Sequence, residues 1–168
     1  MAEVRPARDE DVEAICDICA RAYQATYGEL VSAGYLDRIL DEAYHPEPVG
    51  KKITAAPPDW LGFQVIEEDG RVTGFAAGGI VRPGVGELFT LYLEPGELGR
   101  GLGTLLLDRV TEQLREQGAT EMWAAVLAGN ELGLPFYRAR GFVKAGERKA
   151  YGTTEAEDYW SWLLRRPI

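Results

Sequence analysis

The chain has 168 residues, of which 46% are hydrophobic and 27% are charged, and its formal net charge is −9 at pH 7. This length and composition suit one globular domain, so we expect a single domain over residues 1–168. The acidic balance argues against a nucleic-acid partner, because nucleic-acid backbones bind to basic faces. It favours a cationic small molecule or a basic peptide instead.

The N-terminal residues, the apolar runs and the cysteines argue against further classes of protein. The opening Met1–Pro6 lacks the apolar core of a signal peptide, and no apolar run approaches the length of a membrane span. We therefore expect a cytoplasmic protein with no membrane partner, as a monomer or a homodimer. Cys16 and Cys19 stand three residues apart in a helical pattern, and His45 is the one histidine. These are too few ligands for zinc, so we interpret both cysteines as core residues and expect no metal.

The first third of the chain predicts a strand and two helices. Val4–Ala7 is a short strand, and the acidic run from Asp9 suits a helix N-terminus. Apolar residues then recur at helical spacing: Val12, Ile15, Cys16, Cys19 and Ala22. A second helix is expected around Ser32–Glu42. The aromatic side chains near the junction of the two helices have two expected locations. Tyr35 is expected in the core, whereas Tyr23 and Tyr27 suit either the core or a pocket wall.

The middle of the chain predicts a loop and then a strand meander. Residues 45–59 contain four prolines, which favours a loop with at most one short helix. Alternating apolar residues predict strands at 60–67, 72–81 and 86–93, the first two joined by a turn at 68–71.

The last part alternates helices and strands. We expect a helix from Leu102 to about Gly118, a strand at 121–127, a helix from Gly129 to Arg140, and strands at 142–149 and 159–164. The order is that of a mixed α/β fold. Since a helix connects them, the strands that end near Leu93 and Val126 are expected to be parallel neighbours.

The segment from Glu87 to Thr104 has the composition of an anion site. A strand runs to Pro95-Gly96, alternating glycines follow, and an apolar helix begins at Leu102. Glycines allow close backbone approach, and first-turn N–H groups lack intrahelical partners. A P-loop needs a lysine after Gly101, and Leu102-Gly103 stand there instead. A dinucleotide fingerprint fails because Thr104 occupies the place of its third glycine.

Two paired motifs carry a more specific resemblance. The first is Thr90-Leu91-Tyr92-Leu93-Glu94-Pro95 followed, after five residues, by Gly101-Leu102-Gly103-Thr104. The second consists of Asn130, Phe136-Tyr137 and Gly141-Phe142 after a strand that ends in valine. Together they resemble the acyl-CoA site of the GNAT acetyltransferase superfamily, and the resemblance covers nearly the whole chain. It departs at Leu98, where the family pattern has glutamine or arginine.

The resemblance implies the GNAT fold: a mixed central sheet of about six to seven strands, flanked by about four helices, with two parallel strands that splay at the acyl-CoA site. It implies acetyl-CoA as the acetyl donor. The pyrophosphate would lie at the helix N-terminus and the pantetheine arm along the preceding strand. The residues implied in donor binding are Leu91, Tyr92, Leu93, Leu98, Gly99, Arg100, Gly101, Leu102, Gly103, Thr104, Asn130 and Tyr137.

The resemblance also implies direct attack of an amine on the thioester in a ternary complex. Tyr137 matches the residue that protonates the leaving thiolate, and Glu87 matches a position at which some relatives carry the base. His45 is the other titratable candidate for the base. Tyr23, Tyr27 and Glu87, together with the acidic loop from Tyr151 to Asp158, are candidates for the acceptor side.

The acceptor itself stays open at this level. A small-molecule amine is the leading expectation, and a protein N-terminus or lysine side chain is the alternative. A third possibility is a non-catalytic acyl-CoA-binding module. We expect an open groove between the first two helices and the last hairpin for a peptide acceptor, and a closed pocket for a small one.

Overall fold

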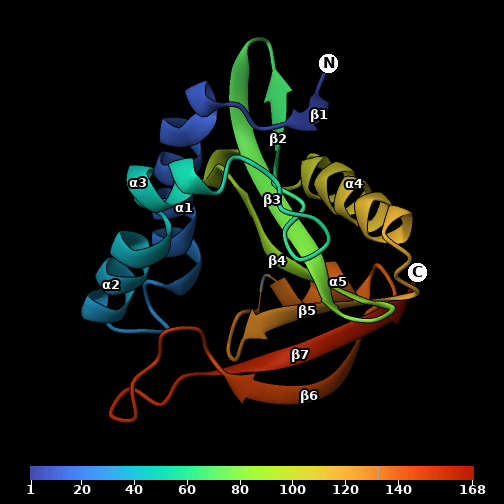
Figure 1. Cartoon of the computed structure of the whole chain (residues 1–168). Helices are drawn as coiled ribbons and strands as arrows, with labels where there is room; N and C mark the ends of the chain where they lie inside the picture. The colour runs from blue at the N-terminus through green and yellow to red at the C-terminus, as the bar shows by residue number, and fades with distance from the viewer. Residues whose placement is uncertain (132) are drawn as a thin grey trace.

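A computed structural model describes residues 1–131 and 133–168, which form a seven-stranded sheet in the order β1-β2-β3-β4-β5-β7-β6 (Figure 1). The strands are β1 (Glu3–Pro6), β2 (Phe63–Glu68), β3 (Arg71–Arg82), β4 (Val85–Leu93), β5 (Glu121–Leu127), β6 (Val143–Lys149) and β7 (Trp160–Pro167). The pairs are antiparallel except for β4 and β5, which are parallel as expected. The mixed sheet confirms the fold expected from the sequence.

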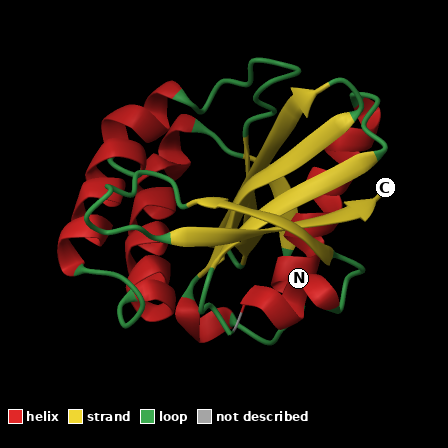
Figure 2. Cartoon of the chain, turned by 90° about the horizontal axis from the view of Figure 1, so that it is seen from below, coloured by secondary structure: helices red, strands yellow, loops and turns green. Residues whose placement is uncertain are grey.

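Helices lie on both sides of this sheet (Figure 2). They are α1 (Val12–Tyr27), α2 (Ala33–Ala43), α3 (Pro46–Lys51), α4 (Leu102–Glu116) and α5 (Gly133–Arg138), with short 3-10 turns at Asp9–Asp11 and Pro95–Glu97. The Ser32 hydroxyl accepts a hydrogen bond from the backbone N–H of Tyr35 (3.1 Å) and so caps α2. In the described part of the chain, no helix is long and apolar enough to cross a membrane.

The two parallel strands separate partway along their length. Residue pairing between β4 and β5 runs only from Val85–Glu121 to Leu88–Ala124. The strands themselves continue to Leu93 and Leu127. Beyond Leu88, therefore, the edge of β4 that faces β5 is not paired with it. This is the splay that the resemblance implied.

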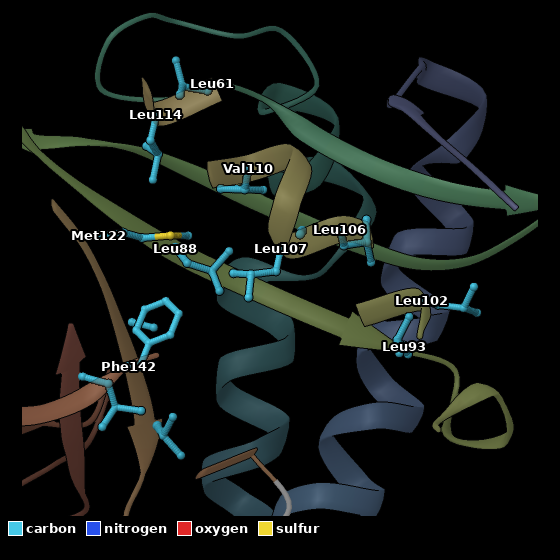
Figure 3. Packing of buried hydrophobic residues seen from close by; sticks show 14 of the residues in the cluster. Leu61, Leu88, Leu93, Leu102, Leu106, Leu107, Val110, Leu114, Met122 and Phe142 are labelled. Atoms are coloured by element: carbon cyan, nitrogen blue, oxygen red, sulfur yellow. The ribbon is translucent and has the colours of Figure 1, made fainter. Parts of the chain in front are cut away.

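The largest core cluster holds α4 against the sheet. The apolar stripe of this helix, which includes Leu106, Leu107 and Val110, is fully buried. Figure 3 shows these side chains over β4, close to Leu88 and Met122. Burying several such side chains stabilises the fold by about 1.5–3 kcal/mol each. The packing fixes the direction of α4, and so the place to which its N-terminus points.

A second core cluster packs α1 and α3 on the other side of the sheet. Cys16 and Cys19 are buried in it as free thiols, as expected, and burial raises the pKa of both. A third cluster lies around α2 and includes Tyr35, which is buried as expected.

Two elements begin three or more residues later than the sequence-based expectation, and the last strand, β7, runs on to Pro167 instead of ending at Leu164. The strand expected from Trp60 begins at Phe63, because Trp60 instead pairs with Ala56 in an isolated bridge. The helix expected from Gly129 begins at Gly133, because the Asn130 side chain accepts a hydrogen bond from the Gly133 N–H (2.9 Å) and caps it.

A buried ion pair between Arg5 and Asp11 connects the N-terminal strand to the start of α1 and makes the stability of the fold depend on pH. The Arg5 guanidinium donates two hydrogen bonds to Asp11 (2.8 and 3.0 Å), and the Arg8 N–H donates a third (2.7 Å). Burial alone would raise the pKa of Asp11, but these donors outweigh it and lower the pKa. The stabilisation is therefore present above the unfolded-state pKa and is lost as the pH falls through the folded-state value.

We expect Asp11→Asn to lower the free energy of unfolding at pH 7 by roughly 3 kcal/mol, since it leaves the Arg5 charge without its main partner. The difference from wild type should begin to shrink below about pH 4, where Asp11 of the unfolded chain takes up a proton, and should disappear once the pH falls below the lowered pKa of Asp11 in the folded state. Urea unfolding at pH 7 and pH 3 measures both values. Asp9→Asn, at an exposed position two residues away, is the matched control. An equal loss at both pH values would contradict the assignment.

Candidate active site

A cavity of about 210 Å³ lies where β4 and β5 separate, between α1 and α5. The lining residues that bear on the argument come from four elements. They are Tyr27 from α1, Phe89 to Leu93 from β4, Ala125 and Val126 from β5, and Asn130, Gly133, Phe136 and Tyr137 in and before α5. The splay that interrupts the sheet therefore opens the space into which a ligand fits.

The lining is largely apolar, with a few polar groups and no charged ones. The hydroxyl-bearing residues are Thr26, Tyr27, Thr90, Tyr92 and Tyr137, and Asn130 contributes an amide. Within the described residues, the lining contains no Asp, Glu, His, Lys or Arg. Any charged group that acts on a ligand must therefore reach it from the rim.

The glycine turn lies at one end of this cavity and leads into α4. Gly99 and Gly101 adopt positive φ angles of 83° and 81°, which a side chain at Cβ would strain. The first backbone hydrogen bond of α4 runs from Leu105 N to Gly101 O (3.3 Å). The N–H groups of residues 102–104 come before this bond and therefore have no acceptor within the helix. Those donors and the helix dipole suit an anion here.

Two side chains of this turn bear on donor binding. Arg100 is implied in donor binding by the resemblance, but its guanidinium contacts Glu97 and lies 2.8 Å from Glu68. Two carboxylates thus already balance its charge, and its part in ligand binding stays a prediction. Leu98 is 57% exposed and lines the cavity, so an apolar side chain stands where a polar one is usual in the motif.

Asn130 and Tyr137 lie on the cavity wall, as the second motif implied. Asn130 caps α5, so its side chain orients the helix that carries Tyr137. The Tyr137 ring packs edge-on against Phe136 (5.1 Å between centroids) and Phe142 (5.3 Å). Burial raises the pKa of the Tyr137 hydroxyl, and the nearby Tyr27 hydroxyl adds to the shift. The group therefore keeps its proton, as a donor must.

The two tyrosines that the sequence left open have different positions. Tyr27 lines the cavity, and its hydroxyl lies 3.1 Å from that of Tyr92. Tyr23 lies behind it, packed against the rings of Tyr27, Tyr44 and Tyr92 at 4.9–5.7 Å, and is not among the lining residues. Tyr27 thus faces a ligand directly, whereas Tyr23 supports the wall. Burial raises the pKa of both hydroxyls.

Glu87 lies beside the cavity, in an ion pair. Its two carboxylate oxygens accept hydrogen bonds from Arg148 of β6 at 3.3 and 3.0 Å. His45, the other candidate base, precedes α3 as its N-cap. Neither residue lines the cavity.

Exposure along the lining indicates two openings. Leu98 and Ala25 are exposed on the side of the glycine turn. Phe89, which is 41% exposed, and Ala125 are exposed on the opposite side. An anionic donor and an acceptor can therefore approach the same space from different directions.

Sequence reasoning missed two arginines near these openings. Arg140 donates a hydrogen bond to the Thr104 hydroxyl (3.0 Å) in the first turn of α4, and its guanidinium lies over the Phe136 ring. Arg148 reaches Glu87 from a strand 61 residues away. Neither position belongs to the motifs, and only the fold brings these side chains to the site.

The described side chains offer few candidate ligands for a metal ion. They contain no group of three or more His, Cys, Asp or Glu residues placed to hold a metal ion. The reactive geometry is that of a cavity with anion-binding backbone at one end and a hydroxyl donor on its wall.

Comparison with known proteins agrees with this geometry. The Acetyltransferase (GNAT) family profile matches residues 16–142. Phosphinothricin N-acetyltransferase of Alcaligenes faecalis is 30% identical over 98% of this chain and 82% of its own length. The [ribosomal protein bS18]-alanine N-acetyltransferase of Salmonella typhimurium is 31% identical over 65% of this chain and 72% of its own.

A solved structure shows the same fold. The PaiA N-acetyltransferase from Thermoplasma acidophilum, in complex with coenzyme A, superposes with a TM-score of 0.85 at 23% identity, over 100% of this chain and 99% of that one. The family match spans most of the chain and includes both motifs. The chain therefore belongs to the acetyltransferase (GNAT) family, and it is an acyltransferase that takes its acetyl group from acetyl-CoA.

Proposed function

We propose that the chain transfers the acetyl group of acetyl-CoA to the primary amine of a small molecule, by direct attack in a ternary complex. One observation carries the choice of a small acceptor. The segment between β6 and β7 is bound to α2, so the groove that a peptide would need is closed on that side. Figure 1 shows this segment beside α2.

Four contacts close the groove. Tyr35 Oη donates to the carbonyl of Tyr151 (2.6 Å), and Arg38 donates to the carbonyl of Gly152 (2.9 Å) and to Glu157 (2.5 Å). The N–H of Ser32 donates to the Tyr159 hydroxyl (2.8 Å). Glu157, a candidate for binding the acceptor, is thus engaged within the fold. A peptide would have to break these bonds to lie between α2 and β7.

The donor is assigned to the end of the cavity at the glycine turn. Its pyrophosphate lies at the N-terminus of α4, with Arg140 as an additional cation nearby, and its pantetheine arm follows Leu91–Leu93. A backbone N–H near Leu91, on the edge of β4 that is not paired with β5, stabilises the oxyanion as the carbonyl is attacked.

The chemistry follows from this placement. The neutral amine attacks the thioester carbonyl, the new C–N bond forms, and the C–S bond breaks. The departing sulfur receives the proton of the Tyr137 hydroxyl, and the proton lost by the amine passes to Glu87 or to water. The products are the N-acetylated amine and the CoA thiol. The sequence-based expectations of a cytoplasmic location and of a monomer or homodimer remain predictions.

The experiment is a screen for release of the CoA thiol. The panel contains small amines, peptides with a free N-terminus and lysine peptides, all with acetyl-CoA at saturation. We expect at least one small amine to be turned over with kcat/KM tenfold or more above any peptide. Turnover of peptides alone would support the protein acceptor suggested by the similarity to the ribosomal-protein enzyme. Acetyl-CoA binding without turnover of any amine would support a non-catalytic module.

Leu98 allows a separate test of the donor end. We expect Leu98→Arg to lower the KM for acetyl-CoA by roughly threefold to tenfold, because it places a cation at the rim that the pyrophosphate approaches. The gain should decrease at high salt, as screening weakens exposed charge pairs. Leu105→Arg, at an exposed position of α4 that does not line the cavity, is the control. Equal effects of the two variants would remove Leu98 from the donor site.

A further inference from the structure

The Glu87–Arg148 ion pair lies over the acceptor-side opening. Glu87 pairs with Trp123 across the β4–β5 ladder, and Arg148 lies across β7 from Leu127. Because alternate residues of a strand share a face, Ala125 lies between those two points and on the same face. Ala125 lines the cavity and is exposed. The ion pair therefore crosses the sheet at the opening through which an acceptor reaches the thioester.

This pair is available for exchange with a ligand. The Arg148 side chain is 49% exposed and that of Glu87 is 13% exposed. Because the Arg148 side of the pair is half-exposed, its guanidinium can turn to a ligand carboxylate at small cost to the fold, and a ligand ammonium can then take its place beside the largely buried Glu87 carboxylate. The bidentate guanidinium of Arg148 matches the geometry of a carboxylate.

The charges around the opening favour an acceptor that carries an anion as well as an amine. The cavity lining is uncharged in the described residues, so recognition of charge belongs to the rim. Arg82 and Arg165 lie 5.6 and 5.9 Å from the centre of the Trp123 ring, two residues along β5 from Ala125. The chain is acidic as a whole, yet this face carries three arginines, counting Arg148, against the two carboxylates of Glu87 and Glu121, of which Glu121 lies 3.3 Å from Arg165. The excess of positive charge favours an acceptor that carries an anion over a polyamine.

We propose that the acceptor is a zwitterion of the α-amino acid type, with its ammonium group on Glu87 and its carboxylate on Arg148. Such a ligand replaces one ion pair within the protein by two between protein and ligand. It places the amine beside the opening between Phe89 and Ala125, directed into the cavity. The proposal rests on the proposed small-molecule N-acetylation and narrows its substrate class.

The first experiment compares acceptors that differ only at the carboxylate. We would measure kcat/KM by CoA release for leucine, leucinamide and 3-methylbutylamine, and for phenylalanine, phenylalaninamide and 2-phenylethylamine. We expect the acids to exceed their amides and amines by roughly 10- to 100-fold in wild type, since a charged partner is lost in the analogues. The effect should lie in KM.

The second experiment tests Arg148 itself. Arg148→Gln should raise the KM of the acids roughly 10- to 100-fold more than the KM of the amides and amines, and Arg148→Lys should restore part of the preference. Lys149→Gln, at the next residue of β6, is the matched control, because its ammonium group lies near the ring of Trp160. A binding readout accompanies the kinetics: with CoA at saturation, leucine should raise the melting temperature of wild type and of Lys149→Gln, and not of Arg148→Gln.

The outcomes separate this inference from the proposed function. If amides and amines are turned over as well as the acids, or if Arg148→Gln affects all three classes equally, the zwitterion assignment is overturned and small-molecule acetylation stands. If peptides alone release CoA, both are overturned. A preference for the acids that disappears in Arg148→Gln supports the proposal.

Discussion

Tyr137→Phe is expected to lower kcat by roughly 10²–10⁴-fold while leaving the KM for acetyl-CoA nearly unchanged. The substitution removes only the hydroxyl that protonates the departing thiolate. The ring that packs against Phe136 and Phe142 is retained, so the cavity wall and the stability of the fold should be preserved. Steady-state release of the CoA thiol measures the kinetic effect, and thermal unfolding checks the fold.

The control for this variant is Tyr151→Phe. Tyr151 is exposed, and it is its backbone carbonyl, not its hydroxyl, that accepts the bond from Tyr35. We expect wild-type kinetics from that control. Full turnover by Tyr137→Phe would remove the tyrosine from the proton transfer and leave water as the donor.

The pH profile gives an independent test of Tyr137. Its hydroxyl is a donor only while it is protonated, and burial raises its pKa above the ordinary tyrosine value of about 10. The donor form therefore persists to higher pH than in an exposed tyrosine. We expect no fall in wild-type kcat from this ionisation up to about pH 10. A kcat that falls near pH 8 in wild type and not in Tyr137→Phe would contradict the assignment.

Gly79→Ala is expected to lower the free energy of unfolding by about 3 kcal/mol, or the melting temperature by roughly 6–12 °C. A Cβ at Gly79 would lie 1.9 Å from the carbonyl oxygen of Asp59, which is a backbone atom. The neighbouring chain cannot move aside at small cost. Leu61 N–H donates to the carbonyl of Gly78 (3.0 Å) and Ile80 N–H donates to that of Pro58 (2.9 Å).

The effect should extend to the acceptor opening. The displaced loop carries Trp60, whose ring stacks on Phe89 at 6.2 Å, so the KM for the acceptor should rise in the folded fraction. Gly34→Ala is the matched control, because no atom lies within 4 Å of its Cβ position in α2. That change should stabilise the chain by up to about 1 kcal/mol. Equal melting temperatures for the two variants would show that the loop yields freely.

The overall charge of the chain and the local charges at the opening suggest different acceptors. An acidic composition favours a cationic partner, but composition averages over the whole surface. The structure gathers Arg82, Arg148 and Arg165 on one face of the sheet, beside the opening at Ala125. The electrostatic potential that a ligand meets therefore depends on which strands lie side by side. The amino-acid composition carries no information about that arrangement.

The sequence by itself determined the donor side. The strand, the glycine turn and the first turn of α4 are contiguous, so the segment from Leu91 to Thr104 already contains the groups that suit an anion. Helical and strand periodicity likewise determined the seven strands, because local packing on a sheet or a helix imposes those spacings. The same short-range signals predicted the helix that carries Tyr137 and placed Asn130 at its start, although the structure has α5 begin at Gly133, three residues after Asn130.

Only the tertiary structure decided the acceptor side. Arg148 and Glu87 are 61 residues apart, and the segment around Tyr151 is bound to an α2 residue more than 100 positions earlier. Such contacts depend on the order of β5, β7 and β6 in the sheet and on how the loop before β7 meets α2, and no local spacing encodes either. The candidate donor site could be proposed from the sequence because its groups are neighbours in the chain, and the proposed acceptor site could not because its groups become neighbours only on folding.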